Sequence, residues 1–217
     1  MLLNRERVKF WQKIIFGAMA ALMAGFLVFG YSGVANSCKN NGLAQTGNSA
    51  LDKQLKQADQ TLKTNPKDAA SLLLLAQGYQ QVAAGKSDGS ADQADALTRA
   101  ISYYDRYLKL PDKTLGAAAA DLRYQALQGV AAAYTKLLDY ADLVKTYQAM
   151  QKVRPKDALL LLGLANAQVN AGQTKAAIAT YQAYLKRQPG SPYAADVKTA
   201  ITKLKAAAAS PSPATSP

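Results

Sequence analysis

Apolar residues recur every three or four positions along much of this chain, as they do on the buried face of an α-helix. The first such run extends from Leu51 to Leu62 and stops before Pro66, a residue that disfavours helix in the position preceding it. A second run covers Leu72 to Val82, and another follows Pro192 as far as Leu204. The pattern therefore predicts an all-α domain that ends in a closing helix.

Part of the chain repeats itself at a distance of 34 residues, which is the separation of Pro155 and Pro189. At this offset Thr146-Tyr147-Gln148-Ala149 returns as Thr180-Tyr181-Gln182-Ala183, and the two copies align without a gap. Small and large apolar residues at fixed places in a period of this length are the signature of a two-helix unit that stacks into a solenoid. The repeat favours a binding surface over an active site.

The repeated unit resembles the tetratricopeptide repeat family, whose pattern includes a leucine, small residues, an aromatic residue and a final proline. Gln168 departs from the pattern, because the family prefers a tyrosine there. The resemblance implies an all-α, antiparallel helix-hairpin solenoid, expected over residues 49–208 as about three repeats with capping helices. The last unit matches the family at Leu161, Leu164, Ala165, Gly172, Ala177, Tyr181, Tyr184 and Pro189.

A third copy begins upstream, because Pro66-Lys67-Asp68-Ala69 returns 89 residues later as Pro155-Lys156-Asp157-Ala158. Asp68 and Asp157 are the predicted helix N-caps, since a short carboxylate accepts the free amide protons of a first helical turn. Two periods of 34 residues fall about 21 residues short of this distance, so insertions are expected between the copies.

The first expected insertion is a loop at residues 85–90, after which Ser90 or Asp92 begins the next helix. Its acidic residues superficially resemble a calcium loop, but Gln93 and Arg99 stand where that loop needs glycine and glutamate. The second insertion is the Ala-rich stretch 115–120, which we expect to lengthen the helix that follows; a separate short helix is the alternative.

In the resembled family the first helix of each hairpin lines a groove that holds a partner. Most residues on the free faces of these helices are amides here, which donate and accept hydrogen bonds at once and therefore suit an extended peptide. A merely solvated face is the alternative at each position. The resemblance assigns the partner-binding groove to Gln77, Gln80, Gln81, Gln125, Gln128, Thr135, Lys136, Asn166 and Asn170.

Residues 14–35 form a run of 22 residues without charge, long enough for a helix to cross the apolar core of a bilayer. Four basic residues and one acidic residue precede it, so the positive-inside rule predicts a cytoplasmic segment at 1–13 and a single transmembrane anchor at 14–35. We expect a polar linker over 36–48 and a disordered Ser/Pro-rich tail over 209–217. Cleavage of the run as a signal peptide, which would give a secreted protein, is the alternative.

The chain has one cysteine and no histidine, which removes an intramolecular disulfide, a zinc cluster and the commonest proton-transfer side chain together. We therefore predict no enzyme, no catalytic residue, no cofactor and no metal site. We expect Cys38 to be an unpaired thiol of the linker, and a bridge between two chains is the alternative.

Past Asn36 the chain carries 22 basic and 13 acidic residues, so the expected external part is itself basic. No nucleic-acid-binding module accompanies this charge, and a nucleic acid partner is not expected. The features together predict a membrane-anchored scaffold that binds a protein or peptide on the extracytoplasmic side of a bacterial-type cytoplasmic membrane, in envelope assembly or secretion. A basic protein that binds anionic lipid or envelope polymer is the alternative, and self-association through the repeat ends stays open.

Overall fold

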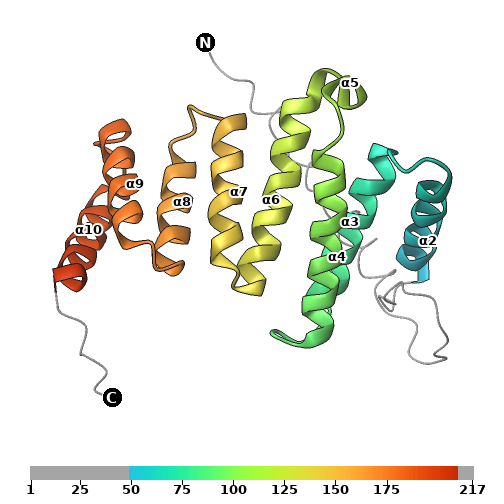
Figure 1. The fold of residues 1–217 in the computed structure, drawn as a ribbon, viewed down its shortest axis with the longest axis horizontal. Helices are drawn as coiled ribbons and strands as arrows, with labels where there is room; N and C mark the ends of the chain where they lie inside the picture. Colours follow the sequence, from blue (N-terminus) through green and yellow to red (C-terminus); the bar gives the residue numbers. More distant parts are fainter. Residues whose placement is uncertain (1–48, 210–217) are drawn as a thin grey trace, which may run out of the picture. The chain divides into compact units, whose positions relative to one another are not determined.

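The computed structural model describes residues 49–209, and these form an array of α-helices that stand side by side (Figure 1). No strand occurs within this range, which confirms the all-α class. The elements are α2 (Ser49–Thr64), α3 (Ala69–Ala84), α4 (Ala91–Leu108), α5 (Asp112–Leu115), the 3₁₀ turn η1 (Gly116–Ala118), α6 (Ala119–Leu137), α7 (Tyr140–Val153), α8 (Leu159–Asn170), α9 (Thr174–Arg187) and α10 (Ala194–Ala209).

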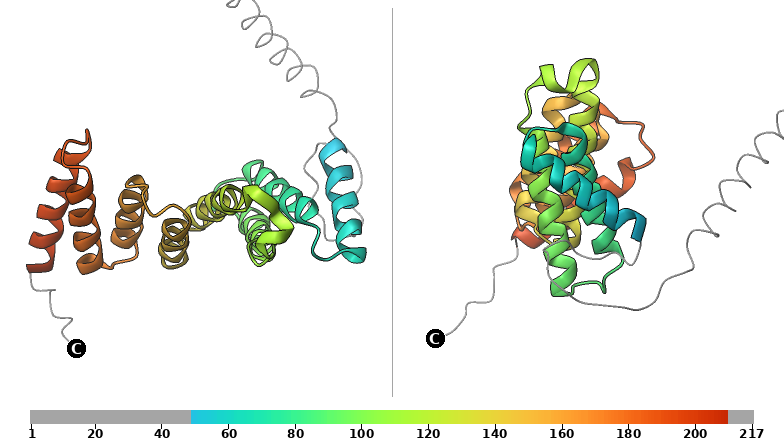
Figure 2. Two further views of the ribbon diagram at one scale, coloured as in Figure 1. Left: turned by 90° about the horizontal axis from the view of Figure 1, so that it is seen from above. Right: turned by 90° about the vertical axis from the view of Figure 1, so that its right-hand side faces the viewer.

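Neighbouring helices in the chain are also neighbours in space, as a helix-hairpin solenoid requires. The pairs α3 with α4, α6 with α7, and α8 with α9 form three hairpins, while α2 packs on α3 and α10 packs on α9. Seen from above in Figure 2, the helices of this domain follow one another in chain order. Within residues 49–209 the predicted helix-hairpin fold is therefore confirmed.

The core alternates small and large side chains, which lets helices approach while the gaps between hairpins are filled. Ala76 and Ala165 are fully buried inside their hairpins, and Tyr104 and Tyr181 are buried where one hairpin meets the next helix. Tyr147 occupies the corresponding place in the second hairpin and is half-buried. Small residues thus lie within the hairpins, and tyrosines fill the space between them.

Helix starts follow the predicted capping chemistry in two cases and depart from it in one. The Asp68 carboxylate accepts the Ser71 amide at 2.8 Å and caps α3, and the Ser90 hydroxyl accepts the Gln93 amide at 3.2 Å and caps α4. The prediction that Asp157 is an N-cap is wrong by one residue. Ala158 holds that position in α8, because the Asp157 carboxylate closes a tighter turn on the Leu159 amide at 3.0 Å.

The Ala-rich insertion lengthens the helix that follows it only in part: Ala119 and Ala120 begin α6, whereas Leu115 ends a separate short helix, which is the alternative expectation. Gly116 has a φ of 73°, in the left-handed region that interrupts a right-handed helix. The chain therefore forms α5 and the 3₁₀ turn before α6 begins at Ala119.

Within residues 49–209 no helix is both long and apolar enough to cross a membrane. The anchor predicted at 14–35 lies outside the described residues, together with the segment at 1–13, the linker at 36–48 and Cys38. The predicted tail also lies outside them, apart from Ala209, which is the last residue of α10.

Candidate partner-binding site

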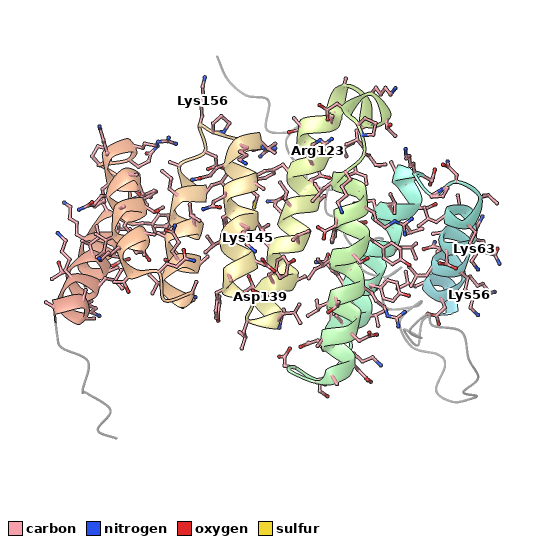
Figure 3. The ribbon with its side chains drawn as sticks, in the orientation of Figure 1. Lys56, Lys63, Arg123, Asp139, Lys145 and Lys156 are labelled. Atoms are coloured by element: carbon pink, nitrogen blue, oxygen red, sulfur yellow. The ribbon has the colours of Figure 1, made fainter. Side chains whose placement is uncertain are left out.

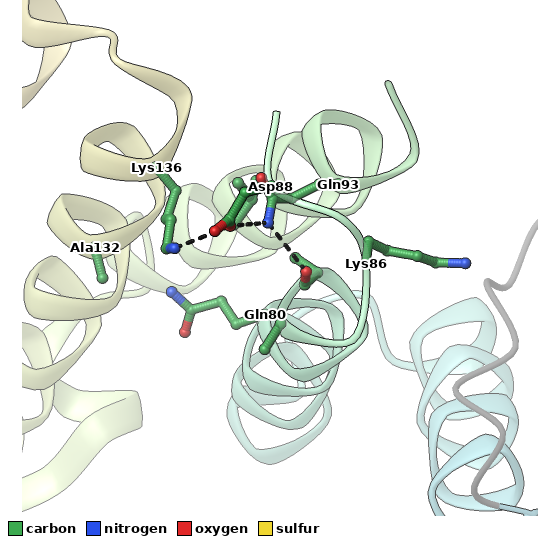
Figure 4. Close-up of a pocket in the computed structure, with 9 residues that line it drawn as sticks. Gln80, Lys86, Asp88, Gln93, Ala132 and Lys136 are labelled. Carbon is green, nitrogen blue, oxygen red and sulfur yellow. Dashed lines mark hydrogen bonds and ion pairs between the residues drawn. The ribbon is translucent and has the colours of Figure 1, made fainter. Parts of the chain in front are cut away.

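A pocket of about 430 Å³ lies between α3, the α3–α4 loop, the start of α4 and the second half of α6 (Figure 4). Two of the predicted groove residues, Gln80 and Lys136, line it from different hairpins. Its remaining lining divides into a polar part, with Lys86, Asp88 and Gln93, and an apolar part, with Ala83, Ala84, Leu97 and Ala132.

Gln93 holds the loop that forms one wall of this pocket. Its side chain is only 4% exposed, and its oxygen accepts the Gly89 amide at 2.9 Å. Its nitrogen donates to the Asp88 carboxylate at 3.0 Å and to the Ala83 carbonyl at 3.4 Å. Because Gln93 ties the loop to the end of α3, the loop keeps a defined shape. Sequence reasoning missed this role, although Ser90 and Gln93 have the spacing of a helix capping box.

An ion pair joins the loop to the next hairpin, because Lys136 Nζ lies 3.1 Å from the Asp88 carboxylate (Figure 4). The hydrogen bond from Gln93 and the nearby Lys136 ammonium together lower the pKa of Asp88 below its ordinary value. The two side chains of the pair are 59% and 80% exposed, so the pair contributes little to stability. The Lys136 ammonium is therefore accessible to an anionic or carbonyl group of a ligand.

Gln80 is already hydrogen-bonded inside the protein, in contrast to the free amide that the groove prediction assumes. Its nitrogen donates to the Gly129 carbonyl at 2.7 Å, and its oxygen accepts the Tyr104 hydroxyl at 2.7 Å. Burial raises the pKa of Tyr104 to about 12, so this tyrosine is neutral at physiological pH. The Gln80 amide thus joins α3, α4 and α6, and it forms part of the pocket lining.

The other predicted groove residues lie on exposed positions outside this pocket. Thr135 donates its hydroxyl to the Ala131 carbonyl of its own helix at 2.7 Å, and Asn166 accepts the hydroxyl of Tyr181. Their side chains are therefore partly occupied by internal bonds. The remaining exposed positions are Gln77 and Gln81 on α3, Gln125 and Gln128 on α6, and Asn170 at the end of α8.

Gln168, which departs from the family pattern, has a structural role. The side chain is buried, and its oxygen accepts the Thr180 hydroxyl from the second helix of the same hairpin at 2.7 Å. A polar pair thus replaces the aromatic contact expected at this position.

The acidic residues of the α3–α4 region pair with cations of the protein. Asp88 pairs with Lys136, Asp92 with Lys86 at 3.7 Å, and Asp95 with Arg99 at 2.9 Å. Across residues 49–209 no group of three or more His, Cys, Asp or Glu side chains is arranged to hold a metal ion.

In a comparison with known protein families, residues 137–201 match the family model described as Tetratricopeptide repeat. A search of curated proteins finds no match. The matched stretch covers α7, α8 and α9 and reaches α10, whereas the residues that line the pocket all precede it in the chain. The match and the array of helical hairpins together show that this part of the chain is similar to tetratricopeptide repeats. Repeats of this class typically serve as non-catalytic surfaces for protein binding.

Proposed function

We propose that this protein is an interaction scaffold, and that its helical domain binds an extended segment of a partner protein at the pocket between α3, α4 and α6. The observation that carries the proposal is the pocket itself, where an apolar wall faces an accessible ammonium within an array of repeat hairpins. Ligand-binding pockets in general combine an apolar lining with a few placed polar groups in this way.

The pocket suits a small aliphatic side chain followed by an oxygen-bearing group. Ala83, Leu97 and Ala132 form the apolar wall, against which an aliphatic side chain would lose its contact with water. Lys136 would exchange part of its interaction with Asp88 for a carboxylate or carbonyl oxygen of the partner.

The partner segment would continue along α6. Gln125, Gln128 and Ala132 are exposed and follow one another at spacings of three and four residues, so they lie on one face of that helix. Side-chain amides on this face can pair with the peptide groups of an extended chain.

We further propose that residues 14–35 anchor the protein in a cytoplasmic membrane, with the N-terminus in the cytoplasm and the helical domain outside, where it would serve envelope assembly or secretion. The uncharged run and the basic residues before it support this topology. Protease added to intact spheroplasts should degrade the helical domain. Protection of the domain until the membrane is opened would rule out an extracytoplasmic location, and a mature chain that starts after residue 35 would establish the cleaved alternative.

The scaffold function is tested by filling the pocket without disturbing the fold. Ala132 is exposed and lines the pocket, so Ala132→Arg should block entry while α6 still forms. Ala179→Arg on α9 is the matched control, because it places the same side chain on an exposed helical alanine away from the pocket. A partner captured from native membranes by the full chain should be lost with Ala132→Arg and kept with Ala179→Arg. Equal capture by the two variants would refute binding at this pocket.

A further inference from the structure

The positive charge of the helical domain is concentrated in its C-terminal part. Residues 49–151 hold 12 basic and 11 acidic residues, whereas residues 152–209 hold nine basic and two acidic residues. The first part therefore is nearly neutral, and the second carries almost the whole charge of the domain.

Four of these cations lie at the same end of the helices. Lys152 is in the last turn of α7, Lys156 is in the α7–α8 turn, and Lys186 and Arg187 end α9. Because consecutive helices run in opposite directions, the end of α7, the start of α8 and the end of α9 meet at one edge, which is uppermost in Figure 1. In Figure 3 Lys156 projects beyond the helix ends at this edge. We call these four residues the basic edge.

The basic edge is preorganised around a shallow pocket of about 350 Å³, which is lined by residues of the α7–α8 turn and the end of α9. Arg187 Nη1 donates to the Pro155 carbonyl at 2.9 Å, which fixes the guanidinium beside Lys156. The only carboxylate in the turn, Asp157, accepts the Leu159 amide instead of a cation. Within residues 49–209, Lys156 and Arg187 have no carboxylate at ion-pairing distance.

Large apolar side chains are exposed at the same edge. Leu159 begins α8 and is 60% exposed, and Tyr193 precedes α10 and is 49% exposed. They are two of the three exposed large hydrophobic residues of the described domain. Cations beside an exposed aliphatic and an exposed aromatic side chain are the combination that binds the interface of an anionic bilayer, where headgroup phosphates meet acyl chains.

We propose that the basic edge, with Leu159 and Tyr193, docks on an anionic lipid surface. Lys156 and Arg187 bind headgroup phosphates, and the two exposed apolar side chains enter the interface. None of these residues lines the Ala132 pocket, so lipid and a partner protein can be bound at once.

The chain contains its own control for this site. Pro66 begins the same Pro-Lys-Asp-Ala turn before α3, and Arg106 Nη2 donates to its carbonyl at 3.2 Å. The Lys67 and Arg106 pair thus repeats the geometry of Lys156 and Arg187 in the nearly neutral part of the domain. Lys67→Gln with Arg106→Gln removes the same two charges and the same kind of hydrogen bond from this copy.

The test compares amide hydrogen exchange of the full chain with vesicles of phosphatidylcholine alone and vesicles that also contain phosphatidylglycerol. Exchange over residues 155–160 and 185–193 should slow only with the anionic vesicles. Lys156→Gln with Arg187→Gln should weaken docking about 25-fold, since each basic residue near an anionic surface contributes about fivefold. The control pair should leave the slowing unchanged. Residues 1–48 are identical in every variant, so they cannot cause a difference between them.

Three results would overturn the proposal: equal exchange with both vesicle types, equal loss in the two double variants, or the same slowing with soluble polyphosphate and no vesicle. The last result would assign the edge to an anionic polymer instead of lipid. Circular dichroism establishes that both double variants are folded. Lys156→Gln alone keeps the test valid if the double variant unfolds, because this exposed side chain makes no described hydrogen bond, and the expected loss is then about fivefold.

Discussion

Tyr104 of α4 lies directly against Gly129 of α6, so that a Cβ atom added to this glycine would come well under 3.0 Å from the tyrosine ring. The same contact recurs at the next hairpin, where Tyr147 of α7 lies against Gly163 of α8. The two glycines are one 34-residue period apart. Contact between a tyrosine ring and a helical glycine thus joins successive hairpins, and Gln80 reinforces the first contact through hydrogen bonds to Tyr104 and Gly129.

Gly163→Ala is expected to destabilise the domain, although alanine is the better helix former. The added methyl would overlap the Tyr147 ring, and overpacking of this kind costs about 1 to 3 kcal/mol. Gly85→Ala is the control, since its added Cβ would meet nothing closer than the Val82 carbonyl at 3.5 Å. Denaturant unfolding should show a loss for Gly163→Ala alone. If both substitutions are neutral, the ring-on-glycine contact does not hold the hairpins together.

The pKa of Tyr104 predicts a loss of stability at high pH. The unfolded tyrosine ionises near pH 10, whereas burial holds the folded one neutral until about pH 12. The stability due to the neutral form is therefore fully present below pH 10 and is lost as the pH rises through 12.

Tyr104→Phe isolates this contribution. Near neutral pH the variant should be less stable by about 1 to 2 kcal/mol, because it leaves the Gln80 oxygen without the Tyr104 hydroxyl. The difference in unfolding free energy between wild type and variant should become smaller from pH 10 to 12, since only the wild type has this tyrosine to ionise. Denaturant unfolding measured across that range checks the sign, and a gap that widens would contradict the burial of a neutral tyrosine.

Buried Gln168 and half-buried Thr180 are expected to be strongly coupled. Thr180→Val leaves the Gln168 oxygen buried without this partner, at a cost of about 1 to 3 kcal/mol. Adding Gln168→Leu removes the unpaired oxygen, so the double variant should be more stable than Thr180→Val alone. A double-mutant cycle of unfolding free energies measures the coupling, and additive losses would mean that the hydrogen bond has no energetic role.

Lys136 is expected to matter for binding and very little for folding. The exposed pair with Asp88 contributes roughly 0 to 1 kcal/mol, so Lys136→Ala should leave the unfolding free energy nearly unchanged. Partner capture by the same variant should fall clearly, because the pocket loses its accessible cation. Lys145→Ala provides the control, since Lys145 is an exposed lysine paired with Asp142 at 2.6 Å on α7. Equal capture by the two variants would show that Lys136 does not take part in partner binding.

The sequence predicted the repeat hairpins well, because their helices and small-to-large core alternation follow directly from residue spacing. It did not predict the pocket, which depends on an insertion outside the 34-residue period. The loop around Asp88 takes its shape from the side chain of Gln93, and it meets Lys136 across 48 residues of chain. Such a contact has no local signature in the sequence.

The structure differs from the sequence-based prediction in two further places, at Gln80 and in the Ala-rich insertion. Gln80 carries the same amide as the exposed Gln77, yet the neighbouring Tyr104 and Gly129 bring it into an internal network. Gly116 interrupts the Ala-rich insertion through its left-handed backbone, although the flanking alanines favour continuous helix. Helical periodicity reports which face is buried, but it does not report which polar group on that face already has a partner.

The central claim, that a partner segment enters the pocket at Ala132, is tested most directly by crosslinking. A photoreactive phenylalanine placed at Gln128 of the full chain, which is exposed on the same face of α6 without lining the pocket, and at Ala179 as the control, would be activated in native membranes. One discrete crosslinked protein is expected from residue 128, abolished by Ala132→Arg, and none from residue 179. The same crosslinks from both positions, or a crosslink from residue 128 that survives Ala132→Arg, would contradict binding at this pocket.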